Sequence, residues 1–208
     1  MLGPPGAGKG TQGARFARTH GLPKISTGDI LRDAVTAGTD VGRAAREVMD
    51  AGRLVGDDIM IQIVRERLER PDTDAGFVID GFPRTVPQAK ALDDLVDDTA
   101  PLVIVDIEVP TEVLVKRLAG RRICGSCGVG APPGATTCAK CGGLLVQRND
   151  DNENVVRERL QVYERSTEAI QQFYARRGTF RSIDGDQTEE SVAADLAAAV
   201  ASALGAHR

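Results

Sequence analysis

Gly3-Pro4-Pro5-Gly6-Ala7-Gly8-Lys9-Gly10-Thr11 is the stretch that decides the fold class of this chain. Glycines let backbone N–H groups curl around phosphate oxygens, and the lysine adds a positive charge at the same place. A helix that starts at this loop would point its positive dipole end at those oxygens. The strict pattern G-x-x-x-x-G-K-[ST] is missed by one position, because a glycine separates the lysine from the hydroxyl. The stretch therefore predicts a phosphate-binding loop, with a flexible glycine–proline turn as the alternative.

The loop begins unusually early in the chain. Only Met1 and Leu2 precede it, whereas such a loop normally leaves a buried parallel strand of roughly five residues. We expect the short lead to open the core beside the loop and to leave the neighbouring strands unpaired. We also expect the true start to lie several codons upstream, with an apolar segment before Leu2.

Length and composition indicate an ordinary globular protein with one sizeable core. The chain has 208 residues, of which 41% are hydrophobic and 27% charged, and its formal net charge is −4. That charge and an aromatic content of 3% argue against a nucleic-acid partner. No apolar run approaches the roughly 20 residues of a membrane span, and no secretory signal opens the chain. We expect a cytoplasmic protein without a membrane partner.

Short β-rich runs alternate with longer amphipathic runs along the chain. Strands are expected at residues 23–26, 77–80, 102–107 and 180–183. Helices are expected at residues 9–19, 29–37, 41–51, 57–70, 86–96, 111–118, 153–176 and 188–204. Asp186, with Glu189 three residues later, predicts a capping-box-like start for the last helix. The alternation predicts an α/β fold with a doubly wound parallel sheet, whose ligands lie at the carboxyl ends of the strands.

Two stretches interrupt this alternation and divide the chain. Residues 26–55 carry helices without a strand, and residues 120–151 are rich in glycine, proline, cysteine and aspartate. We interpret both as insertions on one core formed by residues 1–25, 56–119 and 152–208. Insertions at the ligand face of a sheet are natural lids.

All the cysteines lie in the second insertion, as Cys124-x-x-Cys127 and Cys138-x-x-Cys141. A two-residue spacing lets both thiolates of a pair reach one ion, so two pairs complete a tetrahedral zinc site. Such a site leaves no position open for substrate and would be structural. Two disulfides or a redox pair are the alternative. A zinc ribbon that binds nucleic acid or protein would need basic and aromatic residues between the pairs, and residues 128–137 contain none.

Charged residues follow two of the predicted strands. Asp80 stands at a strand end, where a carboxylate can hold the water shell of Mg²⁺. Arg84 comes just after it, and an arginine can clamp a phosphate with two parallel N–H bonds. Residues 26–29, Ser-Thr-Gly-Asp, also follow a strand and open a helix, with Arg32 one turn inward. Taken alone, the latter motif is more typical of a helix cap than of a binding site.

Together these motifs resemble the adenylate kinase family, and the resemblance covers nearly the whole chain. It rests on residues 3–11, 26–32, 80–84, Gln88, 120–122 and 148–151. It implies a zinc-bearing, long-lid kinase that converts ATP and AMP into two ADP, with Mg²⁺ as a cofactor and Zn²⁺ as a structural ion. It also implies a P-loop core with an AMP-binding insertion and a lid, a role in nucleotide biosynthesis and adenine nucleotide balance, and a monomer.

The resemblance implies a role for each matching residue. Lys9 would follow the transferring phosphoryl group, and Arg84, Arg121, Arg148 and Arg159 would be catalytic, with Arg117 as a further candidate. ATP would be bound by Gly6, Ala7, Gly8, Lys9, Gly10, Thr11, Arg121 and Gln187. AMP would be bound by Thr27, Arg32, Arg53, Leu54, Val55, Gly81, Phe82, Pro83, Arg84, Gln88, Arg148 and Arg159. Thr11 and Asp80 would serve the Mg²⁺ shell, Cys124, Cys127, Cys138 and Cys141 would hold the zinc, and Asp150 and Asp151 would brace the arginines.

Phosphoryl transfer needs alignment and charge neutralisation more than a protein nucleophile. The chain offers no obvious nucleophile–base pair, since it has only two histidines. The nearest alternative is a kinase for another nucleoside monophosphate, but Thr85 and Gln88 favour AMP. A GTPase switch would need an Asn-Lys-x-Asp motif, which is not present. A zinc-ribbon module with a vestigial loop would bind a partner without transferring phosphate.

Overall fold

The computed structural model describes residues 1–96, 101–132 and 134–205. The helices are α1 (Lys9–His20), α2 (Thr27–Ala37), α3 (Asp40–Asp50), α4 (Asp57–Leu68), α5 (Val86–Leu95), α6 (Thr111–Ala119), α7 (Glu153–Ala175) and α8 (Glu189–Gly205). The strands are β1 (Lys24–Ser26), β2 (Val78–Asp80), β3 (Ile104–Glu108), β4 (Arg122–Cys124), β5 (Gly130–Ala131), β6 (Leu145–Val146) and β7 (Phe180–Asp184). Single turns of 3₁₀ helix cover Pro71–Thr73 and Asn149–Asp151. Every predicted helix and strand is found, with ends shifted by one or two residues, and the α/β prediction is confirmed.

Two helix ends differ from prediction for physical reasons. The helix expected over residues 57–70 ends at Leu68, because Pro71 cannot continue an α-helix and starts a 3₁₀ turn instead. The expected cap of α8 at Asp186 is wrong: the hydroxyl of Thr188 accepts the N–H of Ser191 at 3.2 Å. Asp186 lies 3.6 Å from Arg117 instead.

The central sheet is divided into two parallel pairs. β1 pairs with β2, and β3 pairs with β7. Leu2 forms an isolated parallel bridge with Asp106 of β3, and the amino group of Met1 donates to the carbonyl oxygen of Ile79 in β2 at 2.8 Å. Two residues therefore occupy the place between β2 and β3. The expectation of an open core with unpaired neighbouring strands is contradicted at β3, because Leu2 is buried and exchanges backbone hydrogen bonds with Val105 and Ile107.

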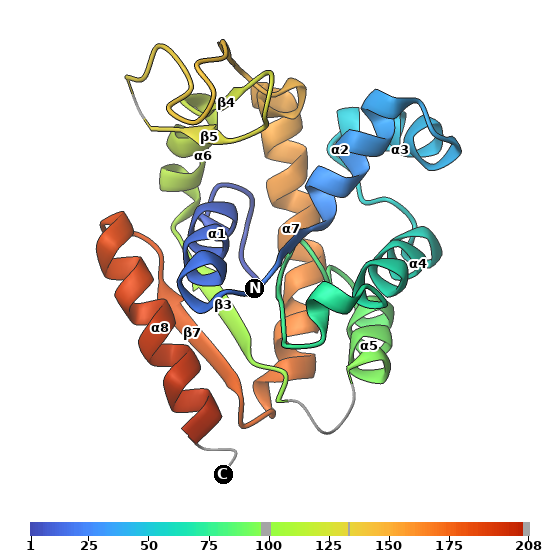
Figure 1. The fold of residues 1–208 in the computed structure, drawn as a ribbon, viewed down its shortest axis with the longest axis vertical. Helices are drawn as coiled ribbons and strands as arrows, with labels where there is room; N and C mark the ends of the chain where they lie inside the picture. The colour runs from blue at the N-terminus through green and yellow to red at the C-terminus, as the bar shows by residue number, and fades with distance from the viewer. Residues whose placement is uncertain (97–100, 133, 206–208) are drawn as a thin grey trace.

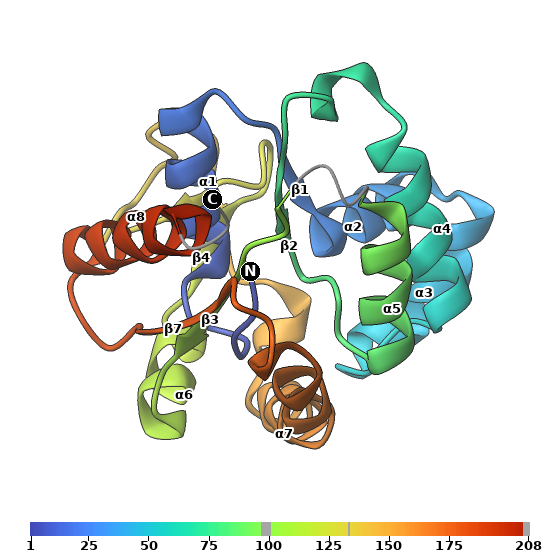
Figure 2. The same ribbon diagram turned by 90° about the horizontal axis from the view of Figure 1, so that it is seen from below.

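Helices cover both faces of the strands. Figure 2 shows α1 and α8 on one side of β3 and β7, and α7 on the other. One core cluster lies under the phosphate loop and includes Ile107, Leu118 and Leu160, from β3, α6 and α7. A second cluster joins α2–α5 to β1 and β2. The predicted phosphate loop therefore packs, through Ala7, on the cluster around β3 and β7.

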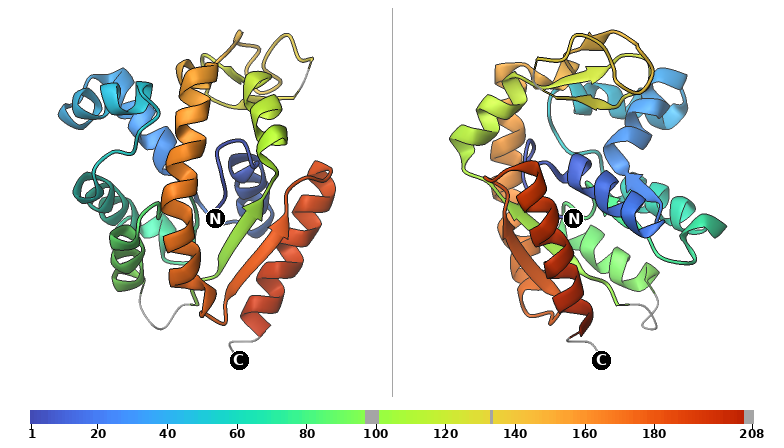
Figure 3. Two further views of the ribbon diagram at one scale, coloured as in Figure 1. Left: turned by 180° about the vertical axis from the view of Figure 1, so that it is seen from behind. Right: turned by 60° about the vertical axis from the view of Figure 1, so that its left-hand side comes forward.

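Both predicted insertions lie over the same end of the core. Figure 1 shows the lid at the top and α2 and α3 at the upper right, on either side of the loop that leads into α1. β4 pairs antiparallel with β5 and β6, so the lid is a small three-stranded sheet. Figure 3 shows α7 running from the lid down the whole molecule. α7 thereby connects the lid, the first insertion and the core.

Candidate active site

The predicted phosphate loop leads directly into α1. A Cβ on Gly3 would lie 2.7 Å from the carbonyl oxygen of Ile107, so the loop passes too close to β3 for any other residue. Gly8 caps α1 with φ of 92°, a conformation that favours glycine. α1 has neither a side-chain cap nor an acidic residue in its first turn. Its first N–H groups are therefore left for an anion, which the helix dipole also favours.

Lys9 lies folded over its own loop. Its Nζ donates to the carbonyl oxygens of Gly3 at 2.7 Å and Pro4 at 2.9 Å. Burial is the main cause that lowers the pKa of Lys9 to about 8; the carboxylate of Asp80 opposes this shift, and the charges of Arg84 and Arg159 contribute to it. The ammonium group is thus held close to where phosphate oxygens would lie.

Asp80 ends β2 beside the first turn of α1. A Cβ on Gly10 would lie 3.6 Å from Oδ2 of Asp80 and 3.8 Å from Nζ of Lys24. Lys24 and Asp80 form a salt bridge of 3.9 Å, which the sequence did not predict. Carboxylate and hydroxyl oxygens suit Mg²⁺ or its bound waters, so Asp80 and the exposed Thr11 fit that ion chemically.

Aspartates at the hinge of the lid hold two of the predicted arginines. Arg121 donates twice to Asp151, with Nε at 2.7 Å from Oδ2 and Nη2 on Oδ1. Arg159 of α7 lies 2.9 Å from Oδ2 of Asp150 and 3.4 Å from Oδ1 of Asp151. The side chain of Asp151 is fully buried, so this pairing fixes where both guanidinium groups point.

Arg148 is the least satisfied of these arginines. Its Nε lies 3.3 Å from Oδ1 of Asp150 without hydrogen-bond geometry, and the atom is buried with no hydrogen-bond partner among the described residues. Burial, and next the positive charge of Arg32, lower the pKa of Arg148 to about 10. A buried guanidinium with spare donors beside other cations is suited to an anion such as phosphate.

The first insertion contributes residues to the same region. Thr27 donates to the carbonyl oxygen of Asp80 at 3.4 Å, and Arg84 donates from Nε to the carbonyl oxygen of Gly81 at 2.8 Å. A Cβ on Gly81 would lie 2.7 Å from Oγ1 of Thr27 and 3.1 Å from Nη2 of Arg84, so the turn allows both to approach. Arg32 pairs with Asp29. The structure thus brings Thr27 and Arg84 together at the end of β2.

The residues after Gly81 divide between core and site. Phe82 is fully buried in the core cluster around α4 and α5, and Pro83 is also buried. Only backbone atoms of this pair are suited to a ligand.

Gln88 lies almost completely buried at the start of α5, with 1% of its surface exposed. Its Oε1 accepts the backbone N–H of Arg84 at 2.8 Å, and its Nε2 donates to Oδ1 of Asp57 at 2.7 Å. Thr85, the N-cap of α5, donates to the same Asp57 oxygen at 2.9 Å. Sequence reasoning missed Asp57, which lies in the first turn of α4.

The loop after α3 packs against α7. A Cβ on Gly52 would lie 2.9 Å from Cγ of Arg159. In the loop that follows, Arg53 is exposed, Leu54 half-buried and Val55 buried. The close approach of Gly52 to Arg159 places the predicted residues 53–55 near this arginine of α7.

In the predicted ATP-base loop after β7, the exposed side chain of Gln187 is engaged by hydrogen bonds within the protein. Nε2 of Gln187 donates to Asp195 at 2.9 Å and to the carbonyl oxygen of Asp184 at 3.0 Å. Arg117 donates to the carbonyl oxygen of Gly185 at 3.0 Å. Because the side-chain amide of Gln187 is engaged in this way, its backbone groups are the better suited to contact a base.

The lid gathers its cysteines at one point. The Sγ atoms of Cys124, Cys127, Cys138 and Cys141 all lie within 4.8 Å of one another. The pairs 124–141, 127–141 and 127–138 are separated by 3.4, 3.5 and 3.6 Å, near the roughly 3.8 Å edge of a tetrahedral Zn–S₄ centre. All four are free thiols, so the two-disulfide alternative is not what the structure shows. The cluster can hold one metal ion.

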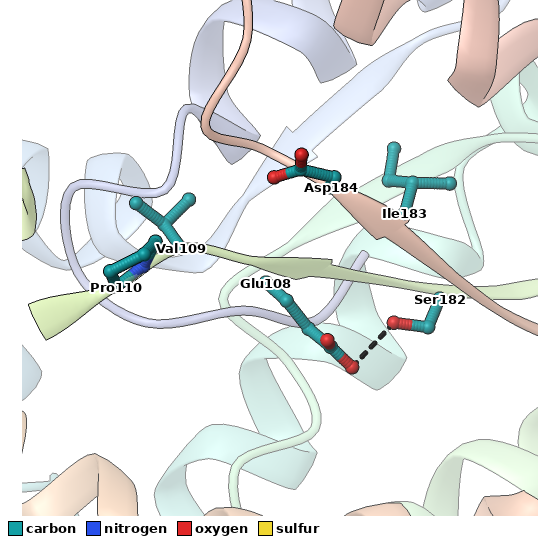
Figure 4. A pocket seen from close by; sticks show the side chains of 6 residues that line it. All are labelled: Glu108, Val109, Pro110, Ser182, Ile183 and Asp184. Carbon is teal, nitrogen blue, oxygen red and sulfur yellow. Dashed lines mark hydrogen bonds between the residues drawn. The ribbon is translucent and has the colours of Figure 1, made fainter.

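A hollow of about 560 Å³ lies at the carboxyl ends of β3 and β7 (Figure 4). Its lining is Glu108, Val109, Pro110, Ser182, Ile183 and Asp184. Ser182 donates to Glu108 across it at 2.5 Å. Two carboxylates and no basic group make this hollow unsuited to phosphate, in contrast to the arginine-lined region around the loop.

None of the described helices combines the length and the apolar composition needed to cross a membrane.

Known proteins match this chain over nearly its whole length. A family model described as adenylate kinase matches residues 1–179. An adenylate kinase of Archaeoglobus fulgidus is 47% identical over 200 residues, which cover 92% of each chain. An adenylate kinase of Symbiobacterium thermophilum is 46% identical over 208 residues, covering 96% of each chain, and one of Geobacillus sp. is 46% identical over 204 residues, covering 94% of each.

Proposed function

This chain belongs to the adenylate kinase family, and we infer that it transfers a phosphoryl group reversibly between ATP and AMP, giving two molecules of ADP. The observation that carries this inference is the convergence of arginines from the lid, the hinge and the end of β2 on the phosphate loop. These are Arg84, Arg121, Arg148 and Arg159, together with Arg32 of the first insertion, whose charge acts on Arg148. Phosphoryl transfer from a nucleoside triphosphate to a nucleoside monophosphate brings several negative charges together and needs this concentration of positive charge.

We propose that ATP lies on the loop at the start of α1. N–H groups of residue 6 and residues 8–11 would donate to its β- and γ-phosphates, whereas the N–H of Ala7 donates within the loop to Pro4. Lys9 would leave the carbonyl oxygens of Gly3 and Pro4 to follow the transferring group. Arg121 would reach the same phosphates from the lid, and backbone groups near Gln187 would face the base. Thr11 and Asp80 would hold Mg²⁺, which supplies neutralisation of charge on the phosphates when bound with ATP.

AMP would lie between the first insertion and the end of β2. Its phosphate would meet Arg32, Arg84, Arg148 and Arg159, and its sugar and base would contact Thr27, residues 53–55 and the backbone of residues 81–83. Gln88 would read the adenine edge. The AMP phosphate oxygen would attack the γ-phosphorus of ATP, and the bond to the β–γ bridging oxygen would break as the new one forms, with ADP as the leaving group.

The arginines perform the electrostatic part of this transfer. Charge spreads over the equatorial oxygens of the transferring group, and guanidinium groups fixed in place stabilise it without reorganisation. Closure of the lid over the first insertion would exclude water, which otherwise competes with AMP as the acceptor. The cysteine cluster would hold a structural zinc ion that folds the tip of the lid, since its four thiolates leave no position for substrate.

The function is tested by ADP formation with AMP, CMP, UMP and GMP as acceptors, with MgATP as donor. We expect the largest kcat/KM for AMP, and a larger value for another acceptor would overturn the assignment. We further propose that the enzyme maintains the balance of adenine nucleotides as a cytoplasmic monomer. Size measurement in solution with and without nucleotide tests the monomer.

A further inference from the structure

Asp57 joins two residues at the start of α5 through its carboxylate. Its carboxylate lies in the first turn of α4 and receives two hydrogen bonds on Oδ1, from Nε2 of Gln88 at 2.7 Å and from the hydroxyl of Thr85 at 2.9 Å. We propose that Asp57 is a positioning residue for base selectivity: it fixes the amide of Gln88 in the orientation that accepts adenine and rejects 6-oxopurines. This inference rests on the proposed role of Gln88 in reading the base.

Of the two hydrogen-bond partners of the Gln88 amide, one can only accept and the other can only donate. A carboxylate accepts hydrogen bonds and a backbone N–H donates one. The amide must therefore place its NH₂ toward Asp57 and its oxygen toward the N–H of Arg84, as the distances of 2.7 and 2.8 Å show. A flipped amide would set NH₂ against N–H and oxygen against carboxylate. Since Gln88 is 1% exposed, either conflict would be costly.

The fixed amide keeps a defined hydrogen-bonding capacity for a ligand. Nε2 has one further hydrogen, and Oε1 has one further lone pair. Adenine offers a 6-amino donor beside a ring-nitrogen acceptor, which complements that pair of groups. Hypoxanthine and guanine carry an acceptor oxygen at position 6, which would face the amide oxygen. Discrimination by an oriented buried polar group is much stronger than discrimination by shape alone.

Thr85 holds Asp57 in place from a second helix. Its hydroxyl accepts the N–H of Gln88 at 3.3 Å as the N-cap of α5 and donates to Asp57. The first turns of α4 and α5 are thereby joined through one carboxylate oxygen. The next residue, Asp58, has the same charge in the same turn of α4 but is exposed, and the hydrogen bonds of Gln88 within the described part of the chain go to Arg84, Thr85 and Asp57. It provides a matched control for helix charge.

The test compares Asp57→Ala, Asp57→Asn and Asp58→Ala with the wild-type chain and with Gln88→Ala. Steady-state assays measure kcat and both KM values with AMP and with IMP as the 6-oxo acceptor, and thermal unfolding checks the fold. For Asp57→Ala we expect the KM for AMP to rise about tenfold or more, with the KM for ATP and kcat changed by less than about threefold. The preference for AMP over IMP should fall about tenfold or more.

The two other variants separate positioning from charge. Asp57→Asn keeps an oxygen that can accept both hydrogen bonds and should retain the wild-type preference, as should Asp58→Ala. Equal preferences in Asp57→Ala and Asp58→Ala would overturn the proposal, and so would an Asp57→Asn variant as unselective as Asp57→Ala. If Gln88→Ala keeps the preference for AMP, the assigned role of Gln88 fails instead. If the wild-type chain forms no ADP from AMP, the proposed function itself fails.

Discussion

Replacing Lys9 with methionine is expected to abolish phosphoryl transfer and to stabilise the fold at neutral pH. The ammonium group is held against Gly3 and Pro4, and burial lowers its pKa from 10.5 to about 8. A lysine whose pKa is lowered by folding is, when charged, less favourable in the folded chain than in the unfolded chain. Methionine keeps most of the length of the side chain without the charge.

The size of the effect follows from the shift in the pKa of Lys9. A shift from 10.5 to about 8 corresponds to about 3 kcal/mol of destabilisation wherever both states are protonated. Lys9 is half-buried rather than fully buried, so this figure is an upper limit. Methionine also loses two hydrogen bonds to carbonyl oxygens, each contributing about 1 kcal/mol. Near neutral pH we therefore expect Lys9→Met to gain at most about 1 kcal/mol in free energy of unfolding.

The pH dependence of the difference in stability between wild type and Lys9→Met is a sharper test. The loss of the two hydrogen bonds contributes nearly the same amount at every pH and therefore largely cancels. Between pH 8 and 10.5 the unfolded chain binds more protons at Lys9 than the folded chain, so the wild-type protein gains stability from this residue as pH rises. Below pH 8 both states are protonated and Lys9 contributes no slope. From about pH 7 to about pH 9.5 the wild-type chain should gain about 2 kcal/mol relative to Lys9→Met.

Urea unfolding of both proteins at several pH values, with the same m-value, measures this difference. Lys90→Met on α5 is the matched control, since Lys90 is exposed and its replacement should leave the pH dependence unchanged. A constant difference between wild type and Lys9→Met across this pH range would refute the reasoning. Substantial ADP formation by Lys9→Met would remove Lys9 from the transfer step.

Three further predictions concern the lid, its hinge and the metal. Replacing Cys124 and Cys138 with serine should abolish zinc binding and lower the melting temperature, while activity at low temperature falls less. Elemental analysis measures the zinc content and calorimetry the melting temperature; an unchanged melting temperature would contradict the prediction. Asp151→Asn should lower kcat about tenfold or more and destabilise the fold by about 1–3 kcal/mol, because the side chain loses the negative charge that faces Arg121 and Arg159. Steady-state kinetics and urea unfolding measure these changes, and wild-type values of both would mean that Asp151 only fills space. Lys24→Gln should lower the Mg²⁺ concentration for half-maximal activity, because Asp80 loses a competing cation at 3.9 Å; a Mg²⁺ titration at fixed ATP that shows no shift would argue against that competition.

The sequence predicted the features that depend on local pattern. Strands such as β3 and helices such as α7 follow from continuous apolar runs and helical periodicity. The cap of α8 was misplaced: Thr188 caps the helix, and Asp186 instead lies 3.6 Å from Arg117, which is distant in sequence. Contacts of this kind are set by tertiary packing and leave no local pattern to read.

Asp57 shows the same limit within the site. Acidic residues are favoured in the first turn of any helix, so Asp57 and Asp58 look equivalent in sequence. Only packing of α4 against α5 reveals that one of them contacts Gln88 and Thr85 while the other faces solvent. The sequence predicted a role for Gln88 because it follows the motif of residues 80–84. Its partner Asp57 lies on another helix and belongs to no motif.

The hinge of the lid combines charge neutralisation with a remaining surplus of positive charge. Asp150 and Asp151 stand against the guanidinium groups of Arg121, Arg148 and Arg159, so two carboxylates face three cations. Full neutralisation would leave no attraction for phosphate, and unopposed arginines would repel one another as they are buried. One charge at the hinge is uncompensated, and Nε of Arg148 lacks a hydrogen-bond partner among the described residues, so the hinge is suited to an anion. Phosphate oxygens would supply the missing acceptors, so substrate binding and closure of the lid would favour each other.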